Sequence, residues 1–215
     1  MVKSKLRHED ERCSEIVSMF LDKHFYKIIF DKPEFQIERI YDKKRQIEGF
    51  DVIIIDTINN EFYGIDEKAA IRYVNKQLNT FSMELSFIDR SGNIHDGWLF
   101  DETKKNNYFL FVWIDKATND ILKSELDIQE VEIALVKREK IIKYLEELGW
   151  TKDKINIKSE KIRSSEKEYG GNIHKYGCKF TCSRYLIEQP VNILISRKNL
   201  IELSTKNLKI NHYGK

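Results

Sequence analysis

The chain has 215 residues, and its 37 basic and 35 acidic residues leave a formal net charge of +2. This length is enough to bury a core as one domain, or as one domain with a substantial extension. Only two prolines and nine glycines, beside 33% charged residues, exclude a low-complexity chain. No apolar run is long enough to cross a bilayer and the charged amino terminus is unlike a signal peptide, so we expect a cytoplasmic protein.

The first elements are predicted as a helix followed by a strand. Residues 9–30 place Ile16, Met19 and Phe20 on one apolar stripe, which is typical of a helix that packs on a core. Pro33 ends this segment, because proline cannot continue a helix. Residues 35–41 then alternate as a strand, and residues 42–45 form a charged turn.

A β-hairpin is predicted next. Residues 50–55 are apolar and β-branched, residues 62–70 form a second extended segment, and Asn59-Asn60 between them suits a tight turn. A loop of two or four residues centred on this pair makes the paired residue numbers add up to 119. In that register Asp51 lies opposite Lys68, and Asp66 lies diagonal to Asp51 on the same face.

Three charged side chains of this hairpin form a candidate site. Diagonal neighbours lie about 7–8 Å apart, so Asp51 and Asp66 would reach one hard cation such as Mg²⁺. Lys68 points the same way as Asp66 because strand side chains alternate, and its ammonium would orient a water or steady charge on a phosphate. A three-residue loop would instead place Glu67 on the face of Asp51, so Glu67 remains an alternative.

Helices and strands alternate in the rest of the chain. We expect a short helix passing into a strand over residues 71–87, a strand over 108–114, and an amphipathic helix over 129–148 that Gly149 ends. Residues 185–187 and 191–195, on either side of Pro190, are predicted as two further strands.

The motif of Asp51 followed by Asp66-Glu67-Lys68 resembles that of the PD-(D/E)XK (restriction-endonuclease-like) nuclease superfamily. The resemblance covers roughly residues 9–115 and implies a core of helix, three-strand meander, helix and strand. It also implies a Mg²⁺ or Mn²⁺ cofactor and a further acidic ligand from the first helix, with Glu15 as the candidate and Glu11 as the alternative. Phe50 stands where the family name has proline.

The carboxyl-terminal third of the chain is basic. Residues 1–150 contain 23 basic and 29 acidic residues, a balance of −6, whereas residues 151–215 contain 14 and 6, a balance of +8. Basic and aromatic side chains alternate there, a mixture that suits phosphate contacts and base stacking. The candidate nucleic-acid contacts are Lys158, Lys161, Arg163, Lys167, Lys175, Lys179 and Arg184.

We therefore predict an α/β protein with a restriction-endonuclease-like core over residues 1–150 and a basic α+β extension over 151–215, packed on the same domain. The predicted function is a Mg²⁺-dependent deoxyribonuclease that hydrolyses phosphodiester bonds of DNA. The family resemblance also implies a homodimer. The alternatives are a catalytically silent nucleic-acid-binding protein of the same fold and a protein–protein module of an anti-defence type. The predicted catalytic residues are Asp51, Asp66, Lys68 and Glu15, and the predicted metal ligands are Asp51, Asp66, Glu67 and Glu15.

Overall fold

The computed structural model of the chain describes residues 2–164, 172–173 and 178–211 and has a mixed α/β architecture. Its residues divide into two compact units. Unit 1 consists of Met1–Leu78, Lys105–Val136 and Ser204–Lys215, and unit 2 consists of Asn79–Lys104 and Lys137–Leu203. The chain thus passes between the units four times, and each unit contains residues from both sides of position 150.

Unit 1 begins with the long helix that the apolar stripe predicts, although the helix starts earlier than residue 9. Its last turns change to a π-helical segment, which shifts the side chains that follow it. The helical segments of unit 1 are α1 (Val2–Leu21), the π-helix η1 (Asp22–Tyr26), α2 (Lys27–Ile29), α3 (Lys43–Ile47), and the 3₁₀ turns η2 (Ile71–Tyr73) and η3 (Glu125–Asp127).

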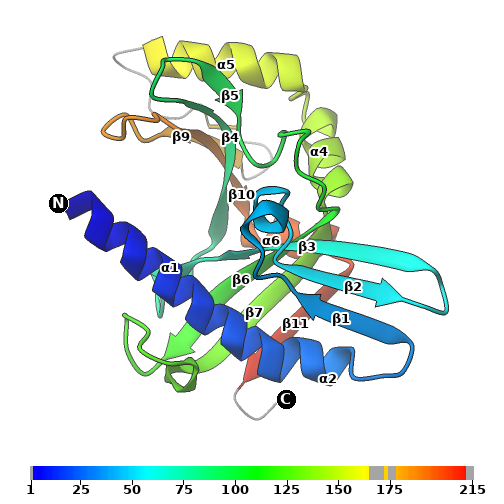
Figure 1. Cartoon of the computed structure of the whole chain (residues 1–215). Coiled ribbons are helices and arrows are strands. Elements are labelled where there is room, and N and C mark those ends of the chain that lie inside the picture. Colours follow the sequence, from blue (N-terminus) through cyan, green and yellow to red (C-terminus); the bar gives the residue numbers. More distant parts are fainter. Residues whose placement is uncertain (1, 165–171, 174–177, 212–215) are drawn as a thin grey trace. The chain divides into compact units, whose positions relative to one another are not determined.

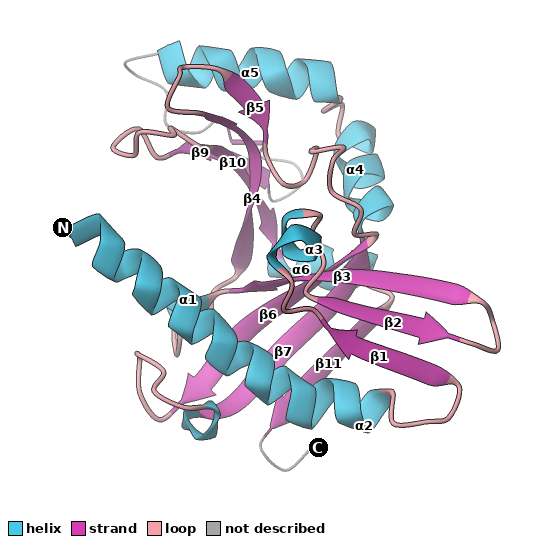
Figure 2. Ribbon diagram, viewed as in Figure 1, coloured by secondary structure: helices cyan, strands magenta, loops and turns pink. Residues whose placement is uncertain are grey.

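The core of unit 1 is a six-stranded mixed sheet in the order β1-β2-β3-β6-β7-β11, which Figure 2 shows in magenta. The β1–β2, β2–β3 and β7–β11 pairs are antiparallel, and the β3–β6 pair is parallel. Its strands are β1 (Phe35–Arg39), β2 (Val52–Asp56), β3 (Glu61–Ala69), β6 (Tyr108–Ala117), β7 (Ile128–Lys137) and β11 (Lys206–Asn211).

Helix α1 crosses one face of this sheet (Figure 1). Its stripe of Ile16, Val17 and Phe20 is buried in one hydrophobic cluster with Val52 and Ile65 of the sheet. Removal of these apolar side chains from water is the main source of stability for an amphipathic helix on a sheet.

The predicted β2–β3 hairpin is present, but its predicted register is wrong. Val52 pairs with Ile65 and Asp56 with Glu61, so paired numbers add up to 117 rather than 119. The loop has four residues and begins earlier than expected. The cause is the carboxylate of Asp56, which accepts hydrogen bonds from the amides of Ile58 and Asn59 and thereby ends the strand at residue 56.

The helix predicted over residues 129–148 is only half correct. Residues 138–147 are helical, but residues 128–137 form strand β7 between β6 and β11. Nearly all of β7 is buried, including Ile133, Ala134 and Val136, and a continuous apolar run fits a helical period as well as a buried strand.

Unit 2 contains a five-stranded sheet in the order β5-β4-β10-β9-β8, with helix α5 against β4 and β10 (Figure 1). Residues 185–187, predicted as a strand, form a turn instead, and Tyr185 there is exposed. The elements of unit 2 are β4 (Thr80–Ile88), β5 (Ile94–Asp96), α4 (Arg138–Glu147), α5 (Lys152–Ser164), β8 (Asn172–Ile173), β9 (Cys178–Cys182), β10 (Val191–Ser196) and α6 (Arg197–Leu203).

Gly64 on β3 allows the ring of Phe50 to pack against the sheet. A Cβ atom at position 64 would lie 2.5 Å from Cε1 of Phe50, closer than such atoms approach in proteins. We therefore expect Gly64→Ala to lower the free energy of unfolding by about 1–3 kcal/mol through overpacking. In a Phe50→Leu background the same change should cost clearly less, because the clashing ring is gone. Urea unfolding of the four proteins measures both effects, and an equal cost in the two backgrounds would contradict this explanation.

Candidate functional site

Asp66 and Lys68 lie side by side on β3, between β2 and β6. Both point away from the face that packs on α1, because their neighbours Ile65 and Glu67 point toward it. Asp66 is 6% exposed, and its Oδ1 lies 2.6 Å from the Nζ atom of Lys68. The lysine thus compensates the charge of a buried carboxylate.

Asp51 lies just before β2 and is held by two bonds to β3. Its amide donates to the carbonyl of Ile65 at 2.8 Å, although Ile65 is already paired with Val52, so two residues oppose one as in a β-bulge. Its Oδ2 accepts a hydrogen bond from the amide of Glu67 at 2.7 Å. The observed register, in which Val52 pairs with Ile65, does not place Asp51 opposite Lys68 as predicted.

The carboxyl group of Asp51 is in an environment that opposes its ionisation. Burial is the largest cause, and the neighbouring carboxylates of Asp66 and Glu67 add to it. The bond from the amide of Glu67 and the ammonium of Lys68 act in the other direction, but the pKa of Asp51 is still raised to about 7. Near neutral pH the carboxyl group of Asp51 is therefore only partly ionised.

Glu67 points to the opposite face of the sheet and is fully bonded there. Its Oε2 accepts hydrogen bonds from Ser18 Oγ at 2.8 Å and from Arg39 Nη1 at 2.7 Å, and its Oε1 accepts one from Tyr26 at 2.9 Å. Donors from α1, η1 and β1 therefore meet on one carboxylate. Between the two alternatives of the sequence, it is Asp66 whose side chain shares a face with Lys68, and Glu67 instead connects the helix to the sheet.

Arg39 is the cation of this second network. Its guanidinium contacts Asp22 as well as Glu67 and lies 5.5 Å from the ring centre of Tyr26. Burial disfavours its charge, but the two carboxylates outweigh this effect and hold its pKa above the ordinary arginine value. Burial and the charge of Glu67 raise the pKa of Tyr26 well above its usual value, so the phenol remains a donor.

The predicted helix ligands are not part of the cluster. Glu15 is exposed on α1, and Glu11 is exposed and lies 3.6 Å from His8. Within the described residues, no group of three or more acidic, histidine or cysteine side chains is arranged to hold a metal ion. Asp51 and Asp66 are therefore the two oxygen donors that the described cluster offers.

The predicted nucleic-acid contacts in unit 2 have different environments. Lys161 and Lys179 are exposed, Lys158 is half-buried, and Lys167 and Lys175 lie outside the described residues. The two arginines bond within unit 2: Arg163 donates to the carbonyl of Gln189 and to Ser86, and Arg184 donates to the carbonyl of Ile162.

The sequence interpretation missed the residues that anchor Glu67. Ser18, Asp22 and Tyr26 are spaced by four, so a helix presents them on about the same side, and Arg39 is the one basic residue of the first strand. This polar spacing was a signal, but a polar stripe on a helix usually faces solvent. Only the packing of α1 on the sheet shows that these side chains point inward.

No model of a protein family matches the chain, and no curated protein or solved structure is significantly similar to it. In the part of the chain that the structure describes, no helix is both long enough and apolar enough to cross a bilayer.

The Arg39–Glu67 pair gives a stability prediction. Arg39→Met keeps most of the side-chain stem but leaves the carboxylate of Glu67 without its cation, which should lower the free energy of unfolding by about 3 kcal/mol. Arg45→Met is the matched control, because Arg45 pairs with Glu38 at the surface and should change stability little. Urea unfolding of both variants at pH 7 measures the difference. Equal stabilities of the two variants would contradict a structural role of the Glu67 network.

The pKa of Asp51 gives a pH prediction for the protein in EDTA. A carboxyl group whose pKa is raised on folding stabilises the protein below its unfolded pKa, and this contribution disappears as the pH rises through the folded value of about 7. Asp51→Asn keeps an acceptor for the amide of Glu67 but cannot ionise. Wild type should therefore lose up to about 4 kcal/mol relative to this variant between pH 4 and pH 8. A difference that stays constant over this range in urea unfolding would refute the raised pKa.

Proposed function

We propose that the protein is a metal-dependent nuclease that hydrolyses phosphodiester bonds of DNA, with its active site at Asp51, Asp66 and Lys68. The observation that carries the proposal is the closeness of the Asp51 carboxyl group, just before β2, to the carboxylate of Asp66 and the ammonium of Lys68 on β3. Burial at this position opposes the ionisation of Asp51. Charged groups are rarely buried together without a function or a structural partner. Here the structural role belongs to Glu67, on the other face.

The donor set fits a divalent cation. Mg²⁺ is typically bound by one or two carboxylates, and waters and substrate oxygens complete its coordination. Asp51 and Asp66 would hold such an ion, which would also offset the repulsion that raises the pKa of Asp51. When bound, Mg²⁺ or Mn²⁺ lowers the pKa of a coordinated water and neutralises charge on a phosphate.

The other groups orient this pair. The amide of Glu67 fixes the carboxylate of Asp51, and the carboxylate of Asp66 fixes the ammonium of Lys68. The Lys68 side chain is 25% exposed, so its ammonium remains accessible to a phosphate oxygen or a water. In this proposal Lys68 positions the attacking water and stabilises the charge that develops on the phosphate.

The order of elements in unit 1 supports a restriction-endonuclease-like core. A long helix precedes the antiparallel meander of β1, β2 and β3, and β6 then pairs in parallel with β3. Two features depart from the family pattern. The chain between β3 and β6 has only the 3₁₀ turn η2 in unit 1 before it enters unit 2, and Phe50 precedes the first acid.

The positive charge of the last third supports nucleic acid as the substrate. In unit 2 the side chains of Lys161 and Lys179 are exposed, whereas those of Arg163 and Arg184 donate to groups of the fold. Phosphate contacts by such lysines would make binding depend steeply on salt.

The Asp66–Lys68 ion pair also favours one alternative function, that of a catalytically silent nucleic-acid-binding protein. It satisfies the charge of a buried acid within the protein, as a catalytically silent nucleic-acid-binding protein of this fold would require. Such a protein would bind DNA with the same salt dependence but would not cleave it.

A cleavage assay tests the proposal. Purified protein is incubated with linear, single-stranded and branched DNA in Mg²⁺, Mn²⁺ or EDTA. Cleavage should require the metal and fall by about 10²-fold or more in Asp51→Asn, Asp66→Asn and Lys68→Ala. The controls are Glu61→Gln, an acid at the far end of β3, and Lys105→Ala, a surface lysine paired with Glu48; both should keep full activity.

Thermal unfolding gives a second readout that does not depend on turnover. Mg²⁺ or Mn²⁺ should raise the unfolding midpoint of wild type and of Glu61→Gln, but not that of Asp51→Asn or Asp66→Asn. A metal-induced shift without cleavage would favour the silent binding protein. Cleavage that survives in the three active-site variants would place the activity elsewhere.

A further inference from the structure

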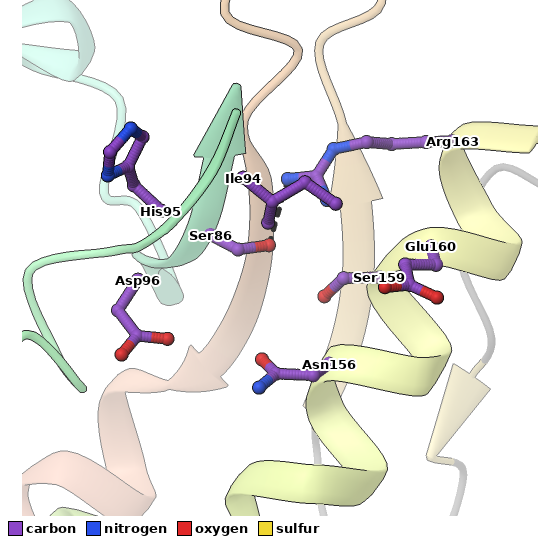
Figure 3. Close-up of a pocket in the computed structure, with 8 residues that line it drawn as sticks. All are labelled: Ser86, Ile94, His95, Asp96, Asn156, Ser159, Glu160 and Arg163. Atoms are coloured by element: carbon purple, nitrogen blue, oxygen red, sulfur yellow. Dashed lines mark hydrogen bonds between the residues drawn. The ribbon is translucent and has the colours of Figure 1, made fainter. Parts of the chain in front are cut away.

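Unit 2 contains a pocket of about 360 Å³ between helix α5 and strands β4 and β5 (Figure 3). This volume lies within the range of pockets that bind small molecules, roughly 300–1,000 Å³. Its polar lining comes from both sides: Asn156, Ser159, Glu160 and Arg163 from the helix, and Ser86, His95 and Asp96 from the strands. All of these residues belong to unit 2, whereas Asp51 and Asp66 belong to unit 1.

Ser159 occupies a position where an apolar residue is expected. It lies between Ile155 and Ile162 on the buried stripe of α5, and all three side chains are at most 1% exposed. The Oγ atom of Ser159 has no hydrogen-bond partner, and Figure 3 shows it directed toward the strands across the pocket. A buried hydroxyl without a partner costs about 1–3 kcal/mol, and alanine at this position would avoid that cost.

Arg163, one turn further along α5, has a second unused donor in the pocket. Its Nε donates to the carbonyl of Gln189 at 3.1 Å and its Nη2 donates to Ser86 Oγ at 2.8 Å. Its Nη1 is buried and has no hydrogen-bond partner. The guanidinium is therefore held in place by two bonds while one of its nitrogen donors remains available.

No carboxylate pairs with Arg163 among the described residues. Asp96 lies 2.8 Å from the ammonium of Lys152, which compensates its charge, and Glu160 is exposed. Burial lowers the pKa of Arg163, and the charges of Glu160 and Glu84 offset this effect only in part. A half-buried guanidinium that is held by neutral acceptors alone is suited to an anion that supplies the missing charge.

We propose that this pocket binds the oxyanion group of a small molecule, a phosphate or a carboxylate, through Arg163 Nη1 and Ser159 Oγ. Ser86 positions the guanidinium, and the amide of Asn156, on the same face of α5, is a further polar group for the ligand. The proposal does not depend on the nuclease activity, because no residue of the pocket belongs to the candidate active site.

Titrations followed by two-dimensional ¹H–¹⁵N NMR, with separate samples of inorganic phosphate, 5′-AMP and acetate, test this proposal. We expect saturable shifts of the Arg163 side-chain resonance and of the α5 amides around Ser159. Saturation by phosphate and 5′-AMP alone identifies a phosphate group as the ligand, and saturation by acetate alone identifies a carboxylate. No saturable shift with any of the three up to 50 mM, roughly the weakest binding that such a titration resolves, would overturn the proposal.

Variants distinguish binding in the pocket from a general attraction of anions to the basic surface. Ser159→Ala should weaken binding at least tenfold and Arg163→Gln should abolish it, whereas Lys154→Gln, which removes an exposed charge from the same helix, should leave it unchanged. If Arg163→Gln does not fold, Ser159→Ala decides alone. That variant should unfold at a higher temperature than wild type without ligand and gain less from phosphate, and unchanged binding by it would refute the proposal.

Discussion

The carboxylate of Glu67 is the point at which helix α1, strand β1 and strand β3 are joined by polar bonds. Ser18, Tyr26 and Arg39 reach it from three segments that are distant in sequence, and each satisfies a group that would otherwise be buried without a partner. Apolar contacts hold α1 on the sheet but do not fix its rotation or its position along its axis, because they have little directional preference. The bonds to Glu67 add direction, since they require one rotation and one axial position of the helix.

The two faces of β3 have different polar environments. On the side of α1, the carboxylates of Glu67 and Asp22 share the guanidinium of Arg39, and two hydroxyls donate to Glu67. On the other side, Asp51 and Asp66 meet a single lysine, and burial together with mutual repulsion raises the pKa of Asp51 to about 7. Because Glu67 fixes β3 through its side chain and orients Asp51 through its amide, the network on the side of α1 also supports the acids around Lys68. Side chains that are held in place by such bonds keep their geometry without a ligand.

In unit 2, two side chains of helix α5 each have a hydrogen-bond donor without a partner. Helix α5 contributes Ser159 and Arg163 to the pocket. Two nitrogens of Arg163 donate to acceptors of the protein, whereas its Nη1 and the Oγ of Ser159 have no hydrogen-bond partner. Of the basic residues that the composition singled out, the two arginines bond within the fold and two of the lysines are exposed. Arginine suits such buried positions better than lysine does, because its planar guanidinium makes several directed hydrogen bonds and is weakly hydrated.

Sequence alone determined the features that depend on local periodicity. The alternation of residues 62–70 places Asp66 and Lys68 on one face in any register, and the apolar stripe of residues 16–20 produces a helix that must cover a core. The tertiary structure decided everything that depends on competition between distant segments. The hairpin register changed because Asp56 bonds to the turn, residues 128–137 became a strand because β6 and β11 lie on either side, and Glu67 became an anchor because Arg39 lies within reach. Local patterns leave several such arrangements nearly equal in energy, and only contacts between segments far apart in the chain select one of them.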